Sequence, residues 1–134
     1  MKKIFVDTSA WFALVNEDDI NHDLAVEWFR NNPLPLFTTN HIFAETLTLI
    51  RMRLGHTQAL AFGNMLLDSG SLQFYWTTPD EEKAAWQFFQ KYSDKDFSFI
   101  DCISFSVMKG QRFKEAFAFD KHFIQAGFNA IPEK

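Results

Sequence analysis

The stretch KKIFVDTSAW, residues 2–11, decides the fold class because it joins a buried strand to a helix through a carboxylate. Residues 3–6, a lysine followed by the apolar residues Ile4, Phe5 and Val6, are typical of a strand inside a sheet, and residues 11–15 carry apolar side chains at helical spacing. Between them, Asp7, Thr8 and Ser9 can cap the helix. A strand followed at once by a helix opens an alternating pattern, which favours parallel strands.

The alternation continues to the end of the chain. Further strands are expected at residues 36–38, 72–76, 116–119 and 128–131. Helices are expected at residues 22–31, 40–54, 56–67, 78–92, 99–110 and 122–126, with Gly55 ending one of them. Strands separated by helices imply parallel crossovers, so we expect an α/β fold, a three-layer α/β/α sandwich with a central parallel sheet of four or five strands. At 134 residues, the chain is expected to form a single domain over residues 1–134.

Composition excludes several classes of protein. Hydrophobic residues make up 47% of the chain and charged residues 22%, which is typical of a globular domain. The apolar run near the start is too short for a signal peptide, and no stretch approaches the roughly 20 residues that span a bilayer. A single cysteine, Cys102, agrees with a reducing compartment, so a cytoplasmic location is expected. The net charge of −4 offers no broad basic surface, so nucleic-acid binding would need a local patch or a metal ion.

Acidic residues stand in four apolar surroundings, at Asp7, Glu45, Asp101 and Asp120. A carboxylate among Phe, Ile and Leu side chains is costly to ionise unless a cation neutralises it. Asp7 and Asp120 directly follow predicted strands, which places both at the carboxyl edge of a parallel sheet. Glu45 and Asp101 fall on the inward stripes of their helices. A shared divalent-metal site explains all four.

Each acid also has a structural explanation. Asp7 and Asp120 can cap the helices that follow them, and Asp101 stands near a helix start. Glu45 has the weakest such explanation, because long acidic side chains in helices usually face solvent. Asp96 lies near Asp101, but its polar neighbours indicate a surface loop.

Taken in order, the motifs VDTS, FAET, FSFIDCISF and FAFD resemble those of a PIN domain, and the size is most similar to VapC-like ribonuclease toxins of toxin-antitoxin pairs. The resemblance spans nearly the whole chain. It implies a metal-dependent endoribonuclease whose acidic centre is Asp7, Glu45, Asp101 and Asp120. It also implies a homodimer and a cognate antitoxin. The accessory hydroxyl positions of the family are matched by Thr8, Ser9 and Ser98.

Oxygen ligands without well-spaced His or Cys residues favour Mg²⁺ or Mn²⁺ over zinc. A bound metal lowers the pKa of water and polarises a phosphate, which suits phosphodiester hydrolysis. We assign Asp7 and Asp101 as direct ligands, and Glu45 and Asp120 as residues that hold waters or a second metal. The four histidines have no metal-site spacing; His122 follows Asp120 closely but is given no role.

Partners are predicted from charged and aromatic residues. An RNA substrate would need cationic side chains along its path. The candidates are Arg51, Arg53, Lys109, Arg112, Lys114 and Lys121. The 17 phenylalanines exceed what a core of this size requires, so an apolar groove for the antitoxin and a dimer face are expected. The aromatic residues proposed for these surfaces are Trp11, Phe12, Trp28, Phe29, Phe43 and Phe62.

Two other classes of function stay open at the level of sequence. A haloacid dehalogenase-like phosphohydrolase would use Asp7 as a covalent nucleophile, but it requires a second Asp where this chain has Ser9. A receiver domain needs an acidic pair and a later Lys that cannot be placed here. A non-catalytic interaction module would retain the acids only as structural groups.

Overall fold

The computed structural model describes residues 2–133, and at its centre is a five-stranded sheet. The strands are β1 (Ile4–Val6), β2 (Leu36–Thr39), β3 (Leu72–Tyr75), β4 (Glu115–Phe117) and β5 (Asn129–Ile131). They lie in the order β3-β2-β1-β4-β5, and every neighbouring pair is parallel. The parallel sheet expected from the sequence is therefore confirmed, with five strands.

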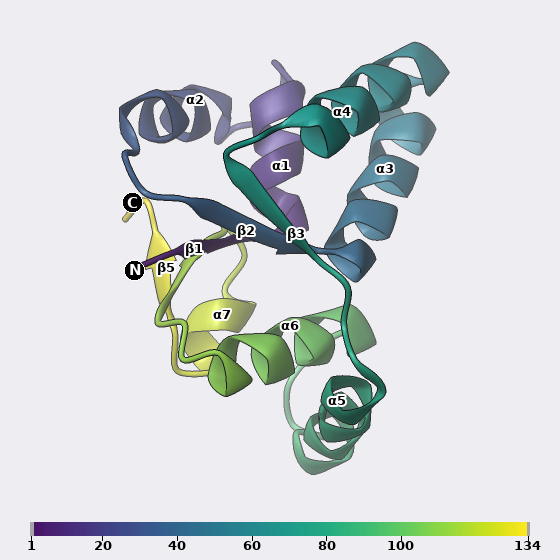
Figure 1. The fold of residues 1–134 in the computed structure, drawn as a ribbon, viewed down its shortest axis with the longest axis vertical. Helices are drawn as coiled ribbons and strands as arrows, with labels where there is room; N and C mark the ends of the chain where they lie inside the picture. The colour runs from purple at the N-terminus through teal and green to yellow at the C-terminus, as the bar shows by residue number, and fades with distance from the viewer. Residues whose placement is uncertain (1, 134) are drawn as a thin grey trace.

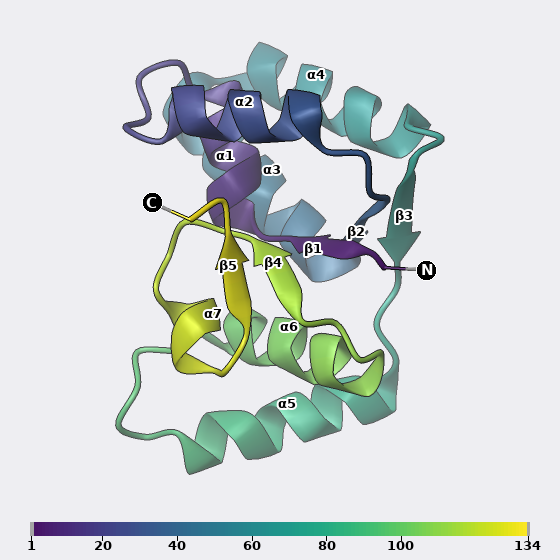
Figure 2. The same ribbon diagram turned by 90° about the vertical axis from the view of Figure 1, so that its left-hand side faces the viewer.

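Helices cover both faces of the sheet. One layer holds α1 (Thr8–Val15), α2 (His22–Asn31), α3 (Asn40–Leu54) and α4 (His56–Asp68), as Figures 1 and 2 show. The opposite layer holds α5 (Pro79–Lys91), α6 (Phe99–Gly110) and the short α7 (His122–Gln125). The fold is the α/β/α sandwich that the alternation of strands and helices predicts. Within residues 2–133, none of the helices has the length and apolar character that a bilayer crossing requires.

The direction in which the chain winds through the sheet reverses between β1 and β4. From β1 the chain moves outward to β2 and β3 with its connecting helices on one face. It then returns to β4 and β5, on the other side of β1, with its helices on the opposite face. Open parallel sheets bind ligands at the carboxyl ends of the strands where the winding reverses. Asp7 follows β1 and Asp120 comes three residues after β4, so both stand at this switch point.

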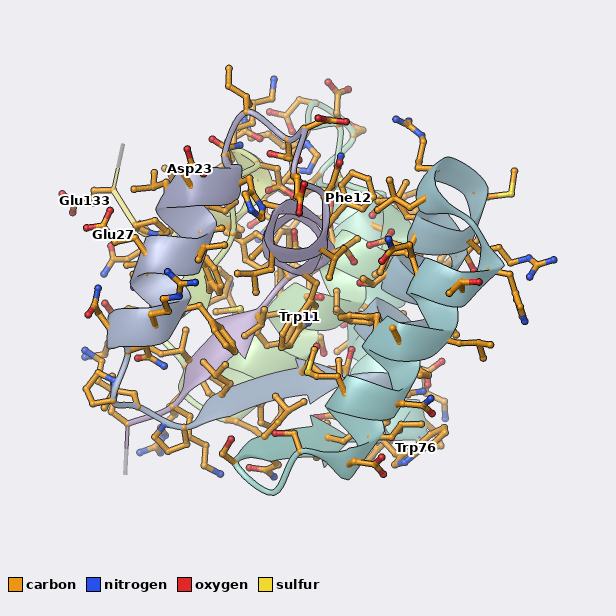
Figure 3. All side chains as sticks on the ribbon, turned by 90° about the horizontal axis from the view of Figure 1, so that it is seen from above. Trp11, Phe12, Asp23, Glu27, Trp76 and Glu133 are labelled. Atoms are coloured by element: carbon orange, nitrogen blue, oxygen red, sulfur yellow. The ribbon has the colours of Figure 1, made fainter. Side chains whose placement is uncertain are left out.

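Aromatic side chains build much of the core, which corrects one expectation from the sequence. Trp11 and Phe62 are buried and pack edge to face with their ring centroids 5.7 Å apart. Trp28 packs on buried Phe117 at 4.2 Å. In Figure 3, Trp11 lies inside the α1–α4 layer whereas Trp76 lies at its periphery. Of the six aromatics proposed for partner surfaces, Trp11 and Phe62 are buried, so the prediction is wrong for these two. The others are half-buried or exposed, and for them it stays a prediction.

Candidate active site at the carboxyl edge of the sheet

Asp7 and Asp120 are brought together by contacts between the ends of β1 and β4. The backbone N–H of Asp7 donates to the carbonyl oxygen of Phe117 at 3.0 Å, which extends the pairing of the two strands. Beyond β4, the backbone N–H of Phe119 donates to the Ser9 hydroxyl at 3.0 Å. The segment that carries Asp120 is thereby held against the start of α1.

Asp7 is both a helix cap and a buried charge. Its Oδ2 accepts hydrogen bonds from the Ser9 backbone N–H at 3.1 Å and from the Ser9 hydroxyl at 2.8 Å. Burial raises the pKa of the Asp7 carboxyl well above its ordinary value, and the charges of Asp120 and Asp101 raise it further. Asp7 therefore caps α1 and at the same time is a buried carboxyl close to two other acids.

Glu45 is fixed by two threonines. Thr8, the first residue of α1, donates its hydroxyl hydrogen to Glu45 Oε1. The Thr46 hydroxyl donates in turn to Thr8 Oγ1 at 3.1 Å. Burial raises the pKa of Glu45, the bond from Thr8 opposes this shift, and the charges of Asp101 and Asp120 add to it. Glu45 therefore lies within the electrostatic reach of the other acids, although it comes from α3 in the opposite helical layer.

Asp101 occupies the first turn of α6 in a reciprocal capping arrangement. The Asp101 N–H donates to Ser98 Oγ, and the Ser98 N–H donates to Asp101 Oδ2, both at 3.0 Å. The same Oδ2 lies 2.8 Å from His122 Nδ1. Burial raises the pKa of Asp101, and the Asp120 charge adds to the shift, whereas the Ser98 N–H and His122 oppose it. Ligand atoms of Asp101, Asp120 and His122 all lie within 4.8 Å of one another.

The four carboxylates share a pattern of bonding. In each, the protein bonds to a single oxygen: Oδ2 of Asp7, Oε1 of Glu45, Oδ2 of Asp101 and Oδ1 of Asp120, the last accepting from the His122 N–H at 3.0 Å. The ion pairs among residues 2–133 join neither Lys nor Arg to any of these acids. The scaffold thus orients each carboxylate without neutralising it by Lys or Arg, and only Asp101 has a histidine partner among the described residues. Such oxygen donors fit a hard divalent cation.

Most of the cations proposed for RNA binding do not lie at this edge. Arg51 and Arg53 are in the last turn of α3, and the Arg51 guanidinium contacts the His56 ring. Lys109 is in the last turn of α6, with its ammonium 4.7 Å from the centre of the Phe88 ring.

Arg112 and Lys114 precede β4 and line a hollow of about 500 Å³ at the amino edge of the sheet, together with Lys2 and Lys3. Of the six candidates, Lys121 adjoins an acid because it follows Asp120 in the sequence, and the assignment of all six to RNA binding stays a prediction. These residues were chosen as RNA-binding candidates only because they are positively charged. Charge does not reveal at which edge of the sheet a side chain lies.

Two residues of the site were not predicted. His122 was given no role because it lacks metal-ligand spacing, yet it bonds Asp101 through its ring and Asp120 through its backbone. Its position two residues after Asp120, at the start of a helix, was the available signal. Thr46 lies next to Glu45 in sequence, and nothing but its neighbour distinguished it from other helical threonines. Asp96, the alternative acid, is exposed in the loop before α6.

Comparison with known proteins defines the class to which this fold and site belong. The model of the PIN domain family matches residues 4–129. The chain therefore belongs to the PIN domain family.

Its relatives narrow the position within the family. The chain is 38% identical over 125 residues to the 23S rRNA-specific endonuclease VapC20 of Mycobacterium tuberculosis, which covers 93% of this chain and 95% of the relative. It is 30% identical over 119 residues to a VapC ribonuclease of Archaeoglobus fulgidus, covering 81% and 72% of the two chains. The similarity to VapC-like nucleases expected from the sequence is confirmed.

Solved structures give the same result. The crystal structure of Mycobacterium tuberculosis VapC20, described as a toxin that cleaves the sarcin-ricin loop, superposes with a TM-score of 0.91. The two share 37% identity over 96% of this chain and 98% of that one. FitAcB from Neisseria gonorrhoeae superposes with a TM-score of 0.68 at 15% identity, over 96% of each chain, which shows the common fold alone.

Proposed function

We propose that this protein is a divalent-metal-dependent endoribonuclease of the VapC class that acts as the toxin of a toxin-antitoxin pair in the cytoplasm. The observation that carries the proposal is the convergence, at the switch point of a PIN fold, of four oriented carboxylates that pair with neither Lys nor Arg among the described residues. The relative that is 38% identical is a 23S rRNA-specific endonuclease, so ribosomal RNA is the first substrate to test.

The four acids would have two different roles in binding the metal. Asp7 and Asp101 would hold Mg²⁺ or Mn²⁺ directly, each with the oxygen that its own helix cap does not use. Glu45 and Asp120 would orient water or a second ion. The chemistry that the cation supplies when bound is activation of water and polarisation of the scissile phosphate.

The accessory residues keep the acids in place. Ser9 orients Asp7, Thr8 orients Glu45, and Ser98 with His122 orients Asp101. Residues that fix metal ligands in this way commonly change metal affinity or activity 10–100-fold when mutated.

Partner binding is proposed for the surface between α3 and α4. A hollow of about 240 Å³ there is lined mainly by apolar atoms, including exposed Met52 and Leu60. An amphipathic helix of an antitoxin would place its apolar face in such a groove. A homodimer is proposed on the strength of the VapC-like relationship, and light scattering of the purified protein tests it.

Cleavage assays test the enzymatic proposal. Purified protein with Mg²⁺ or Mn²⁺ should cut ribosomal RNA, EDTA should stop cleavage, and Asp7→Asn should abolish it. Asp96→Asn is the matched control, because Asp96 is an exposed loop residue, and this variant should cut at the wild-type rate. Cleavage by Asp7→Asn at the wild-type rate would disprove the assigned centre.

Hydrolysis of small phosphate esters without RNA cleavage would instead support a dehalogenase-like activity. Failure to bind Mn²⁺ would support a non-catalytic module. Expression of wild type and Asp101→Asn in a bacterial host extends the test to toxicity. Only the wild type should arrest growth and fragment RNA.

A further inference from the structure

The hollow of about 500 Å³ at the amino edge of the sheet gathers cations in a chain whose net charge is −4. Lys2 and Lys3 precede β1, and Arg112 and Lys114 precede β4. The acid among the described residues that line the hollow is Glu115, so cations outnumber acids four to one. We call this site the basic hollow.

The sheet brings the two basic segments together. β1 and β4 are neighbouring parallel strands, and their register pairs Phe5 with Ala116. Extended by two residues toward the amino edge, the same register sets Lys3 opposite Lys114, on strands about 4.8 Å apart. Like charges in opposite positions on neighbouring strands destabilise a sheet unless an anion lies between them.

Contacts within residues 2–133 neutralise only part of this charge. Lys2 forms an ion pair with Glu115. The Lys3 ammonium donates to the side-chain oxygen of Gln73, which is an uncharged partner. The ion pairs of the described residues include neither Arg112 nor Lys114. Three cations of the basic hollow therefore have no carboxylate partner there, and the hollow attracts anions.

The backbone of Arg112 is strained in a way that concerns its side chain. Its φ is 61°, and within residues 2–133 it is the one residue other than glycine with a positive φ. Gln111 caps α6, so Arg112 stands at the position after the cap, where helices commonly place glycine. A side chain in this left-handed conformation costs energy, and such strain is often found at ligand sites. Arginine at this position therefore has a functional explanation if its guanidinium binds a ligand.

Phe113 holds the cations on either side of it. Phe113 is buried, and its ring centroid lies 4.7 Å from that of Phe37 and 6.4 Å from that of Phe5. Its N–H donates to the carbonyl oxygen of Met108 at 2.8 Å. Arg112 and Lys114, its two neighbours, are exposed. The backbone that carries both cations is thus fixed before a ligand arrives, which lowers the entropic cost of binding.

The size and chemistry of the basic hollow favour a small phosphorylated ligand. A volume of about 500 Å³ lies within the range of small-molecule sites. A phosphate group carries nearly two negative charges and three acceptor oxygens. Arginine can bind two of these oxygens at once, and each lysine adds a compact positive charge. Lys3, Arg112 and Lys114 together suit one or two such groups.

The position of the basic hollow separates its ligand from the substrate at the acids. Four residues of β1 lie between Lys3 and Asp7, a distance of roughly 13 Å along the strand. Helical layers cover both faces of the sheet between its two edges, as Figure 2 shows. An RNA strand bound at the acids would have to cross a whole layer to reach the basic hollow.

We propose that the basic hollow is a second ligand site, which binds the phosphate groups of a small molecule through Lys3, Arg112 and Lys114. The ligand is a nucleotide or a free oligophosphate, which present the same chemistry to these side chains. Arg112 and Lys114, predicted from the sequence to bind RNA, would bind this ligand instead. The proposal is independent of the ribonuclease activity.

Calorimetric titration of the purified protein tests the site, with inorganic pyrophosphate and ADP as probes. EDTA is present, so no metal ion draws either probe to the acids. Wild type should bind at least one probe. Arg112→Gly should weaken binding roughly 10- to 100-fold, the equivalent of one charge-assisted hydrogen-bonded contact. Its melting temperature should not fall, because glycine adopts a positive φ without strain.

Two further variants isolate the role of the guanidinium. Lys109→Ala removes the same charge from the end of α6, but Lys109 lies over the Phe88 ring and outside the lining of the basic hollow. Its affinity for pyrophosphate should equal that of wild type. Arg112→Lys keeps the charge without the two-pronged contact and should bind with intermediate affinity.

The two probes distinguish the sources of the phosphate. Equal affinity for pyrophosphate and ADP assigns the site to a free oligophosphate, whereas tenfold tighter binding of ADP assigns it to a nucleotide. The proposal is overturned if neither probe binds wild type, or if Arg112→Gly and Lys109→Ala bind pyrophosphate equally well.

Two macromolecular probes test the other possible occupants. An RNA of about ten nucleotides is titrated in the Asp7→Asn background. If Arg112→Gly weakened its binding as much as that of pyrophosphate, the basic hollow would belong to the RNA path and the proposal of a separate site would fail. A glutamate-rich peptide that bound more tightly than pyrophosphate would likewise overturn the proposal, in favour of an acidic segment of a protein partner.

Discussion

The Ser9 hydroxyl accepts a hydrogen bond from the backbone N–H of Phe119, although the two residues are 110 positions apart in the chain. The same hydroxyl donates to Asp7 Oδ2 at 2.8 Å. One small side chain therefore orients one acid and anchors the segment that carries another, Asp120. The spacing between these two acids depends on a contact that no local sequence pattern encodes.

Ser9→Ala should weaken the site and the fold together. The substitution leaves the Asp7 carboxylate and the Phe119 amide each short of one hydrogen-bond partner. We expect a loss of about 1–3 kcal/mol in the free energy of unfolding, together with weaker Mn²⁺ binding by calorimetry. Ser106→Ala is the matched control, because Ser106 bonds the Glu81 carbonyl oxygen at 2.8 Å, away from the acids. It should lower stability similarly and leave Mn²⁺ affinity unchanged; equal Mn²⁺ affinity in both variants would contradict the role of Ser9.

Asp7→Asn should stabilise the metal-free protein at neutral pH. Burial raises the pKa of Asp7 in the folded state, so the folded protein binds its proton more tightly than the unfolded chain does. The resulting cost to stability begins as pH rises past the unfolded value near 3.9 and is complete above the raised folded pKa. An asparagine removes this cost and can still cap α1. We therefore expect a higher free energy of unfolding for Asp7→Asn than for the wild type at pH 7 in EDTA.

The pH dependence of this gain is its test. The difference in unfolding free energy between Asp7→Asn and wild type should grow from pH 4 to pH 7 in EDTA. A difference that shrinks as pH rises would mean that the pKa of Asp7 is lowered by folding, contrary to its burial. Asp96→Asn, on the exposed loop, should show no such trend.

Bound Mn²⁺ should make the wild type more stable than Asp7→Asn, the reverse of the order expected in EDTA. Mn²⁺ at about 100 times its dissociation constant should stabilise the wild type by about 2.7 kcal/mol. Asp7→Asn lacks one proposed ligand and should gain much less. Thermal melting with and without Mn²⁺ measures both values. Equal gains would place the ion elsewhere.

His122→Ala should lower activity without unfolding the protein. His122 Nδ1 lies 2.8 Å from Asp101 Oδ2, so its loss frees the carboxylate to rotate. We expect a 10–100-fold fall in kcat/KM, in the range seen when residues behind metal ligands are removed. His122→Asn can place an amide N–H near the same oxygen and should recover part of the loss. His122 would have a purely structural role if His122→Asn recovered no activity. The same conclusion would follow if His122→Ala unfolded at the assay temperature, because loss of folded protein would then explain the loss of activity.

The position of the cations predicts a contrast between two variants. Lys121→Ala, beside Asp120, should weaken RNA binding and reduce the slope of log affinity against log salt by about one. Lys114→Ala, at the opposite edge of the sheet, should change neither quantity. Fluorescence titration in the Asp7→Asn background at several salt concentrations measures both. An equal effect of the two substitutions would show that RNA also contacts the amino edge.

Much of the fold could be predicted because each step is local. Apolar runs of strand length alternate with helical spacing, and Gly55 and the Thr78-Pro79 start mark boundaries that the structure retains. The meeting of Asp7 and Asp120 could be inferred from the rule that parallel strands share a carboxyl edge. The positions of Glu45 and Asp101 followed from the inward stripes of their helices.

What could not be predicted depends on contacts between distant segments. The Ser9 to Phe119 bond and the packing of His122 on Asp101 exist only after the chain has wound around the sheet. Two of the aromatic residues were misjudged for a related reason. Composition counts aromatic residues but does not show that Trp11 on α1 and Phe62 on α4 meet each other inside the core.

The single thiol has a practical consequence for studying this protein. Cys102 is fully buried behind Asp101, and burial together with the Asp101 charge raises its pKa to about 11. The thiolate that reacts with maleimides or oxidants is therefore scarce and shielded at neutral pH. Cys102 should therefore react little with thiol-specific labels in the natural chain. A cysteine introduced at an exposed position such as Gln87 would carry a dye without the need to replace Cys102.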